Sequence, residues 1–270
     1  MKRLFSAQDG GRMFDLAQEQ MQRARGQARV SFDGGRLTGL SQAGSGKVML
    51  PSTYRDCPEA VFLNTAGGLT GGDAFAFEAS VSGGALMATT QTAERAYAST
   101  GAAAAVDVSF HVGDGATLYW LPQETILFNG SRLHRRTTIH AAADARVLAL
   151  EMLVFGRAAM GETLSDFELH DRREILGQDG PVWVDALHLN AGLLGQAAGL
   201  AGARAIATLA YIAPEAQDVR LDLPEGLHAS AWDGKLVIRG GASDLWPLKK
   251  AVSKVLTQIT RGALPRVWAV

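Results

Sequence analysis

AFAFEASVSGGALMATTQT, residues 74–92, decides the fold class of this 270-residue chain. On both sides of its SGG segment, apolar side chains recur mostly at every second position. This period places alternate side chains on opposite faces of an extended strand, and adjacent glycines allow a tight turn. The stretch therefore predicts a β-hairpin, with strands at residues 74–81 and 85–92 joined by a turn at 82–84.

The same pattern recurs further along the chain. Two more strand–turn–strand series occupy residues 106–112, 113–115 and 116–121, and residues 126–128, 129–131 and 135–140. Residues 146–155 (RVLALEMLVF) then form a nearly continuous apolar run, which favours a strand covered on both faces, with a buried helix as the competing interpretation. Turns at this spacing are typical of an all-β domain, so a mainly β fold is expected.

Two stretches favour helix. Residues 15–25 are rich in residue types that form helices well, although the segment is polar. Near the C-terminus, Ser243 or Asp244 can cap a helix that runs to Gly262. Its apolar side chains recur at three- and four-residue spacings, at Leu245, Leu248, Val252, Val255, Leu256 and Ile259. The sequence therefore predicts a small helical portion that includes a C-terminal helix.

No linker, repeat or break in composition divides the chain. Residues 1–270 are therefore expected to form a single domain, with residues 177–185 as the best candidate for a minor boundary. The apolar stretch 187–212 is interrupted by polar residues, so it predicts buried core rather than a membrane span. The first twenty residues turn polar too early for a signal peptide.

Charge and cysteine content narrow the partners and the compartment. The chain has 26 Lys and Arg against 27 Asp and Glu, so it has no basic field that would attract nucleic acid or anionic lipid. Cys57 is the only cysteine, which excludes an internal disulfide and fits a reducing compartment. The expected location is the cytoplasm, with neither nucleic acid nor membrane as a partner.

The glycine-rich run NTAGGLTGGD, residues 64–73, invites comparison with phosphate-binding loops. Its glycines form two adjacent pairs before a predicted strand, which does not fit the dinucleotide fingerprint. The dipeptide Gly46-Lys47 is followed by Val48, so there is no P-loop either. The glycines are better explained by positive φ angles and close backbone approach between strands.

Signatures of metal binding and nucleophilic catalysis are missing from the sequence. The histidines are scattered, with no two at the i,i+2 or i,i+4 spacing that directs both toward one metal: His111, His134, His140, His170, His188 and His228. No Gly-x-Ser-x-Gly motif is present, and Cys57 has no catalytic motif beside it. The sequence predicts no permanent metal site and no catalytic residue.

Carboxylates within the apolar strands remain to be explained. Glu94, Glu124, Glu151 and Glu162 lie in or next to such stretches, where a buried charge is costly unless it is paired or solvated. One interpretation is ion pairing with a nearby arginine, or exposure at strand ends. The other is an internal polar track whose oxygen ligands pass on a divalent cation.

Five blocks in this sequence resemble the urease accessory protein UreD family, called UreH in some lineages. They are residues 63–73 (LNTAGGLTGGD), 89–97 (TTQTAERAY), 121–132 (LPQETILFNGSR), 151–162 (EMLVFGRAAMGE) and 265–268 (PRVW). The resemblance implies a solenoid-like, β-helix-like stack of strands with a small helical portion. It also implies a non-enzymatic scaffold that helps to assemble the nickel centre of urease.

The resemblance further implies partners and cofactors. The partners are apo-urease, a helical accessory protein of the UreF type, and a GTPase of the UreG type that carries nickel. No cofactor is bound tightly: nickel is transient, and GTP is bound only by the partner GTPase. The C-terminal region is a candidate docking surface for the helical partner.

The family has no catalytic residues to carry over, so the candidate site is a transient nickel path. Its oxygen ligands, chosen from within the matching blocks, are Asp73, Glu94, Glu124, Glu151 and Glu162. The alternative function is a small-molecule-binding enzyme that holds an anionic ligand in the glycine-rich loop between Asn64 and Asp73.

Overall fold

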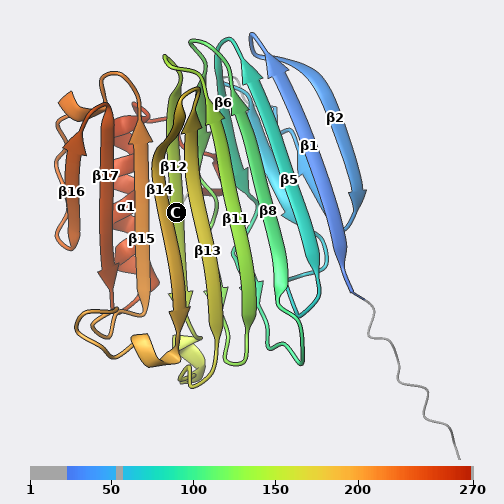
Figure 1. The fold of residues 1–270 in the computed structure, drawn as a ribbon, viewed down its shortest axis with the longest axis vertical. Helices are drawn as coiled ribbons and strands as arrows, with labels where there is room; N and C mark the ends of the chain where they lie inside the picture. The colour runs from blue at the N-terminus through green and yellow to red at the C-terminus, as the bar shows by residue number, and fades with distance from the viewer. Residues whose placement is uncertain (1–22, 53–56, 269–270) are drawn as a thin grey trace, which may run out of the picture.

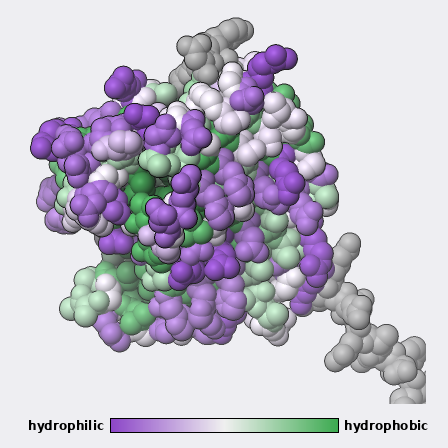
Figure 2. Space-filling view, turned by 45° about the horizontal axis from the view of Figure 1, so that its top comes forward, coloured by the Kyte–Doolittle hydropathy of each residue, from purple (hydrophilic) through white to green (hydrophobic). Residues whose placement is uncertain are grey.

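Two β-sheets dominate the computed structural model, which describes residues 23–52 and 57–268. Figure 1 shows one sheet in front of the other, with the helix α1 behind the strands β15 and β17 of the rear sheet. Figure 2 shows hydrophilic side chains over much of one face, with apolar ones gathered in a hollow. The fold is mainly β, as the alternating sequence pattern predicts.

The front sheet has seven strands. Their spatial order is β14 (Gly180–Asn190), β13 (Glu168–Gly177), β11 (Arg132–Ala141), β8 (Ala104–Val112), β5 (Ala74–Ser82), β1 (Arg25–Asp33) and β2 (Arg36–Gly44). The strands from β1 to β13 pair in parallel with their neighbours, whereas the two edge strands, β2 and β14, are antiparallel.

The rear sheet has ten strands. Eight of them follow the order β16 (Leu227–Trp232), β17 (Lys235–Ala242), β15 (Ala205–Ile212), β12 (Arg146–Phe155), β9 (Thr117–Trp120), β6 (Ala85–Thr90), β4 (Glu59–Asn64) and β3 (Gly46–Met49). The short strands β10 (Thr125–Leu127) and β7 (Glu94–Ala96) pair beside this path. The strands β4, β6, β9 and β12 are parallel, and the strands at both ends are antiparallel.

The three predicted hairpins are wrong. In each, the first strand and the return strand belong to different sheets: β5 and β6, β8 and β9, and β10 and β11. Gly83 and Gly84 do adopt the positive φ angles, 61° and 77°, that a tight hairpin turn requires. Here they turn the chain from the front sheet to the rear sheet, so each strand finds its partners in more distant parts of the chain.

Parallel pairing on both sheets follows from this alternation. Because successive segments cross from one sheet to the other, strands of the same sheet run in the same direction and stack in register. Antiparallel strands end both sheets, and neither sheet closes on itself. The solenoid-like description therefore stays a prediction.

The strand β12 separates two apolar cores, which explains its nearly continuous apolar sequence. Val147, Leu153 and Phe155 lie in the core between the sheets. Leu148 and Met152, on the opposite face, lie in a second core that includes α1. The prediction of a strand covered on both faces is confirmed, because successive side chains point to opposite sides of the sheet.

The helix α1 (Leu245–Ile259) is the predicted C-terminal helix. The Asp244 side chain caps it by accepting a hydrogen bond from the Trp246 N–H at 2.8 Å. Gly262, with φ 89°, lies beyond its end. The described helical portion is completed by the short 3-10 segments η1 (Ala158–Met160), η2 (Ala191–Leu193), η3 (Ala216–Asp218) and η4 (Arg266–Trp268).

The structure differs from the sequence-based expectations at three other segments. The helix expected at residues 15–25 lies mostly outside the described residues, and Arg25 begins β1 rather than ending a helix. Residues 177–185 form the turn and return strand of the β13–β14 hairpin, so they are not a boundary. Within 187–212 the buried core comprises Leu189 and most of β15, whereas most of the residues between them are exposed or half-buried. The single domain of residues 1–270 stays a prediction.

Among residues 23–52 and 57–268, no helix is both long enough and apolar enough to cross a membrane.

Packing of α1 on the rear sheet can be tested at Leu256, which is fully buried in the second core. We expect Leu256→Ala to lower the free energy of unfolding by about 2–5 kcal/mol, because it leaves a cavity without weakening the helix. Lys254→Ala, at an exposed position of the same helix, is the matched control. Urea titration of both variants measures the difference, and equal midpoints would contradict this account of the packing.

Candidate functional site

A buried ion pair connects the two sheets. Arg135 lies on β11 at an inward-facing position between Leu133 and Thr137. Its Nη2 lies 2.9 Å from Glu151 Oε2 on β12 of the facing sheet. Both side chains are at least nine-tenths buried, with 10% and 5% exposed. A charged contact therefore spans the largely apolar layer between the sheets.

Arg135 is held in place by further contacts. Its Nε donates to Asp171 Oδ1 at 3.0 Å and its Nη2 to Asp171 Oδ2 at 2.8 Å, which makes a bidentate pair with β13. Its Nη1 donates to Thr125 Oγ1 at 2.9 Å. Arg173 extends the cluster, because its Nη2 donates to Asp185 Oδ2 at 2.8 Å. The bidentate contact with Asp171 and the hydrogen bond to Thr125 fix the planar guanidinium of Arg135 in one orientation.

Glu151 is the carboxylate with the least support in this cluster. Its Oε1 is buried without a hydrogen-bond partner among the described residues. Burial raises the pKa of Glu151 to about 7. The positive charge of Arg135 opposes this rise, and the negative charge of Asp171 adds to it. By contrast, burial alone would raise the pKa of Asp171, but the contacts with Arg135 lower it. At neutral pH, the protonated and ionised forms of Glu151 are therefore both populated, while Asp171 stays ionised.

Glu94 shares a cavity with Glu151. This cavity, of about 50 Å³, lies between the sheets and is also lined by Arg135 and Thr125. Burial raises the pKa of Glu94 to about 7, although Asn64 Nδ2 donates to its two oxygens at 3.3 Å. The structure thus brings together two candidate carboxylates that are 57 positions apart in the sequence.

Two further spaces share lining residues with this cavity. Glu94 also lines a second cavity of about 50 Å³, together with Asn64 and Arg95. Glu151 also lines a space of about 10 Å³, together with Arg173 and Thr208. The two spaces of about 50 Å³ each hold a few water molecules at most. They could therefore admit a metal ion that has lost most of its water ligands, but not an organic substrate.

Glu124 lies next to this site but is occupied by an ion pair. Its Oε2 is 2.9 Å from the Lys249 Nζ of α1, which also donates to Gln123 Oε1 at 2.5 Å. Its backbone carbonyl accepts from the Glu94 N–H at 2.9 Å. Glu124 therefore connects the C-terminal helix to the strand that presents Glu94.

Asp73 and Glu162 have structural partners and do not line these cavities. The two oxygens of Asp73 accept from the backbone N–H groups of Ala24 and Thr70, each at 2.8 Å. Glu162 accepts from Arg157 Nε at 2.9 Å, and this contact lowers its pKa. The ion-pair interpretation thus describes Glu162, whereas Asp73 fixes the start of β5.

The glycine-rich loop, residues 64–73, is packed against β7 and the segment after it. A Cβ on Gly68 would collide with the Tyr97 ring, and one on Gly71 with Ser99 Oγ. Leu69 N–H donates to the Arg95 carbonyl at 2.7 Å. These contacts agree with the interpretation of close backbone approach, because only glycine leaves the space that they need.

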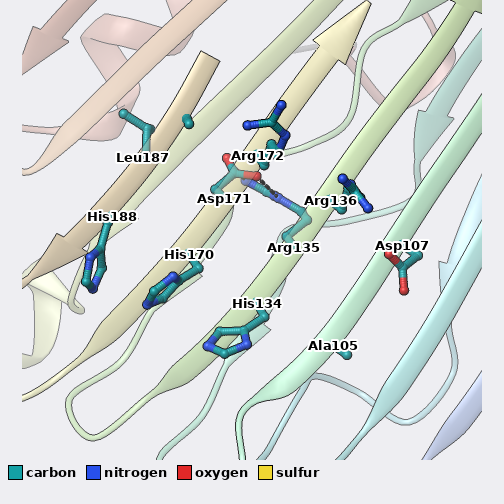
Figure 3. Close-up of a pocket in the computed structure, with 11 residues that line it drawn as sticks. Ala105, Asp107, His134, Arg135, Arg136, His170, Asp171, Arg172, Leu187 and His188 are labelled. Atoms are coloured by element: carbon teal, nitrogen blue, oxygen red, sulfur yellow. Dashed lines mark hydrogen bonds and ion pairs between the residues drawn. The ribbon is translucent and has the colours of Figure 1, made fainter. Parts of the chain in front are cut away.

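The histidines are scattered in sequence but not in space. Register pairing on three neighbouring strands places His134 beside His170, and His170 beside His188 (Figure 3). Glu168 completes the group, with Oε1 2.7 Å from His170 Nε2. The spacing of the histidines in the sequence did not predict this row, because a search for helical or within-strand spacing does not detect neighbours on adjacent strands. The absence of a permanent metal site stays a prediction.

Arg135, Asp171 and Arg173 were missed by the search for carboxylates in matching blocks. The alternation of apolar and polar residues along each strand could have identified them. Each occupies an inward position, where the same strands otherwise have apolar residues such as Leu133, Leu169 or Ile175. A charge at such a position must be paired inside the fold.

Comparison with known proteins now decides the family. The sequence model described as "UreD urease accessory protein" matches residues 23–269, nearly the whole chain. The chain belongs to the UreD family of urease accessory proteins. The resemblance seen in the five sequence blocks is thereby confirmed.

Individual relatives agree with this family membership. The urease accessory protein UreD of Jannaschia sp. (strain CCS1) is 46% identical over 266 residues, covering 96% of this chain and 100% of the relative. That of Dinoroseobacter shibae is 48% identical over 267 residues, covering 94% and 95%. That of Agrobacterium fabrum is 38% identical over 260 residues, covering 92% of each. These proteins are named as accessory proteins of an enzyme.

The raised pKa of Glu151 predicts a pH-dependent stability. The pKa rises from 4.5 to about 7 on folding, so the native state binds the proton more tightly. The free energy of unfolding should therefore be highest below pH 4.5 as far as this group is concerned, and should fall as the pH rises through about 7.

The wild-type free energy of unfolding should decrease between pH 5 and pH 8. We expect Glu151→Gln to make this decrease smaller by about 2–3 kcal/mol, since one pKa unit corresponds to about 1.4 kcal/mol. Urea titrations across this range measure it. Glu78→Gln, on the outer face of β5 where Glu78 pairs with Arg29, should keep the wild-type profile. The assignment would be wrong if Glu151→Gln kept that profile as well.

Proposed function

We propose that this chain is a non-catalytic scaffold for urease maturation, which binds apo-urease and accessory proteins of the UreF and UreG types in the cytoplasm. Family membership supports the accessory role, since the relatives carry the name of a urease accessory protein. Nickel is the cargo of this assembly, and GTP is bound by the partner GTPase. The scaffold assists nickel insertion into the urease active site.

We propose further that Glu94 and Glu151 line a transient nickel path between the two sheets. The observation that carries this proposal is the cavity of about 50 Å³ that both carboxylates share. Each has a pKa raised to about 7, so each can hold a proton when the cavity is empty and release it when a cation arrives. Glu151 Oε1, which lacks a hydrogen-bond partner among the described residues, is the oxygen available to such an ion.

The same arrangement favours passage over storage. The carboxylates of Glu94 and Glu151 and the amide of Gln123 provide few ligands in the cavity. The buried Arg135 guanidinium also repels a cation that stays beside it. Oxygen ligands also hold nickel less tightly than imidazole or thiolate ligands do. Asp73, Glu124 and Glu162, the other residues predicted for the path, act in this proposal as supports of the loops and strands around it.

The alternative, an enzyme that binds an anion in the loop at residues 64–73, has less support. Backbone N–H groups would have to bind the anion. Those of Ala66, Leu69, Thr70 and Gly72 already donate to protein acceptors. Few donors of the loop therefore remain for a ligand.

The scaffold is tested by copurification of the full chain with apo-urease and the UreF-type and UreG-type proteins. We expect a complex at micromolar concentrations and no conversion of a small-molecule substrate by the chain itself. Absence of association at those concentrations would sink the scaffold proposal.

The path is tested by the double variant Glu94→Gln/Glu151→Gln, which keeps the shape of both side chains but removes both charges. We expect nickel loading and activation of urease to fall by at least about tenfold, with assembly of the complex unchanged. Glu78→Gln, an acidic residue outside the cavities, is the control. Lost assembly would indicate a structural role instead, and full activation would remove both residues from the path.

A further inference from the structure

The outer face of the front sheet carries a second group of metal-ligating side chains. Atoms able to bind a metal in His134, Glu168 and His170 all lie within 4.8 Å of one another. Among the described residues, this is the only set of three or more histidine, cysteine or acidic side chains that meets this condition. It lies on the face opposite the cavity of Glu94 and Glu151, since these residues occupy the outward positions of their strands.

The backbone brings these side chains together. His134 on β11 and His170 on β13 are direct partners in the parallel register, and Glu168 precedes His170 by two positions, on the same face of the strand. His188 on β14 is the antiparallel partner of His170. Ring centroids are 4.7 Å apart for His134 and His170, and 3.9 Å for His170 and His188. Figure 3 shows the three rings in a row across three strands.

We propose that His134, Glu168 and His170, with His188 as a fourth ligand, form a surface site for a divalent transition-metal ion such as Ni²⁺ or Zn²⁺. Three imidazoles and one carboxylate are a typical donor set for such ions and a poor one for Mg²⁺ or Ca²⁺. This site does not depend on the nickel path, because it uses other residues on the other face of the sheet.

The geometry needs only small side-chain adjustments. In a tetrahedral site with metal–ligand bonds of about 2.1 Å, neighbouring ligand atoms lie about 3.4 Å apart. The present separations among His134, Glu168 and His170 are at most 4.8 Å, and these side chains are exposed or half-buried, so rotation about their side-chain bonds can close the difference. The exposed His188 ring, whose centroid lies 3.9 Å from that of His170, can reach the same point by rotation. The hydrogen bond of 2.7 Å between Glu168 and His170 shows that the carboxylate already faces a ring nitrogen.

The surroundings leave room for the ion. The histidines line a hollow of about 430 Å³, which also holds Arg136 and Arg172. Both guanidiniums pair with Glu174, at 3.5 Å and 2.9 Å. The two guanidiniums share one carboxylate, so one positive charge is left over beside the histidines, and Asp107 in the lining of the hollow offsets part of it. The Glu168 carboxylate, 3.9 Å from Arg132 Nε, provides the negative charge within the site itself.

The same sheet provides a matched control. His111 and His140 are also register partners on neighbouring strands, with ring centroids 4.8 Å apart and nearly parallel rings. They belong to no set of three candidate ligands in the described part of the chain. A stacked histidine pair without the carboxylate and the third imidazole should bind metal far more weakly.

The experiment titrates the full-length chain, free of any histidine tag, with Ni²⁺ and Zn²⁺ by calorimetry. Co²⁺ absorption reports the ligand geometry. We expect one site on this face, weakened at least about tenfold by His134→Ala/His170→Ala and clearly weakened by Glu168→Gln. His111→Ala/His140→Ala should leave the affinity unchanged. Circular dichroism and urea titration verify that each variant is folded.

Three outcomes would overturn the proposal. These are no binding of either ion by the wild-type chain, equal losses in the test and control histidine variants, and a Glu168→Gln variant that binds like wild type. If the test variant failed to fold, Glu168→Gln and His188→Ala would decide. Binding retained in His134→Ala/His170→Ala but lost in Glu94→Gln/Glu151→Gln would support the internal path and contradict this surface site.

Discussion

The contact of Arg135 with Asp171 and Glu151 is the interaction on which the interior depends. One guanidinium binds a carboxylate of its own sheet in bidentate geometry and reaches a second carboxylate on the facing sheet. A buried charge requires such partners, so the spacing and alignment of the sheets are restricted wherever this contact forms. Beside this contact, burial together with the charge of Asp171 raises the pKa of Glu151, and one oxygen of Glu151 has no hydrogen-bond partner among the described residues. The same carboxylate lines the cavity that it shares with Glu94.

Local patterns in the sequence predicted the elements better than their partners. The helix α1 and the strand β12 follow from apolar spacing and a capping residue, which act within a few residues. The hairpins failed because a glycine turn flanked by alternating strands looks the same whether the second strand pairs with the first or crosses to another sheet. That choice depends on strands far away in the chain, which the turn residues do not encode.

For the candidate site too, the sequence predicted individual residues but not which of them lie together. Glu94 and Glu151 were found because they lie in blocks shared with the UreD family, while their common cavity required the fold. Arg135 and Asp171 could have been found, since each interrupts an apolar alternation. The histidine row could not, because it depends on the register between β11, β13 and β14, and no residue near His134 specifies its neighbour on the next strand.

The crossing of the chain between sheets also has a consequence for folding kinetics. Each parallel strand waits for a partner that is synthesised only after the chain has visited the other sheet, as with β1 and β5. Such non-local pairing is slow, and it leaves strand edges open to other chains in the meantime. The apolar outer face of β15 and β17 packs against α1, which follows both strands in the sequence. A nascent chain of this protein therefore exposes its second core until α1 has been synthesised, and chains truncated before α1 should aggregate rather than fold.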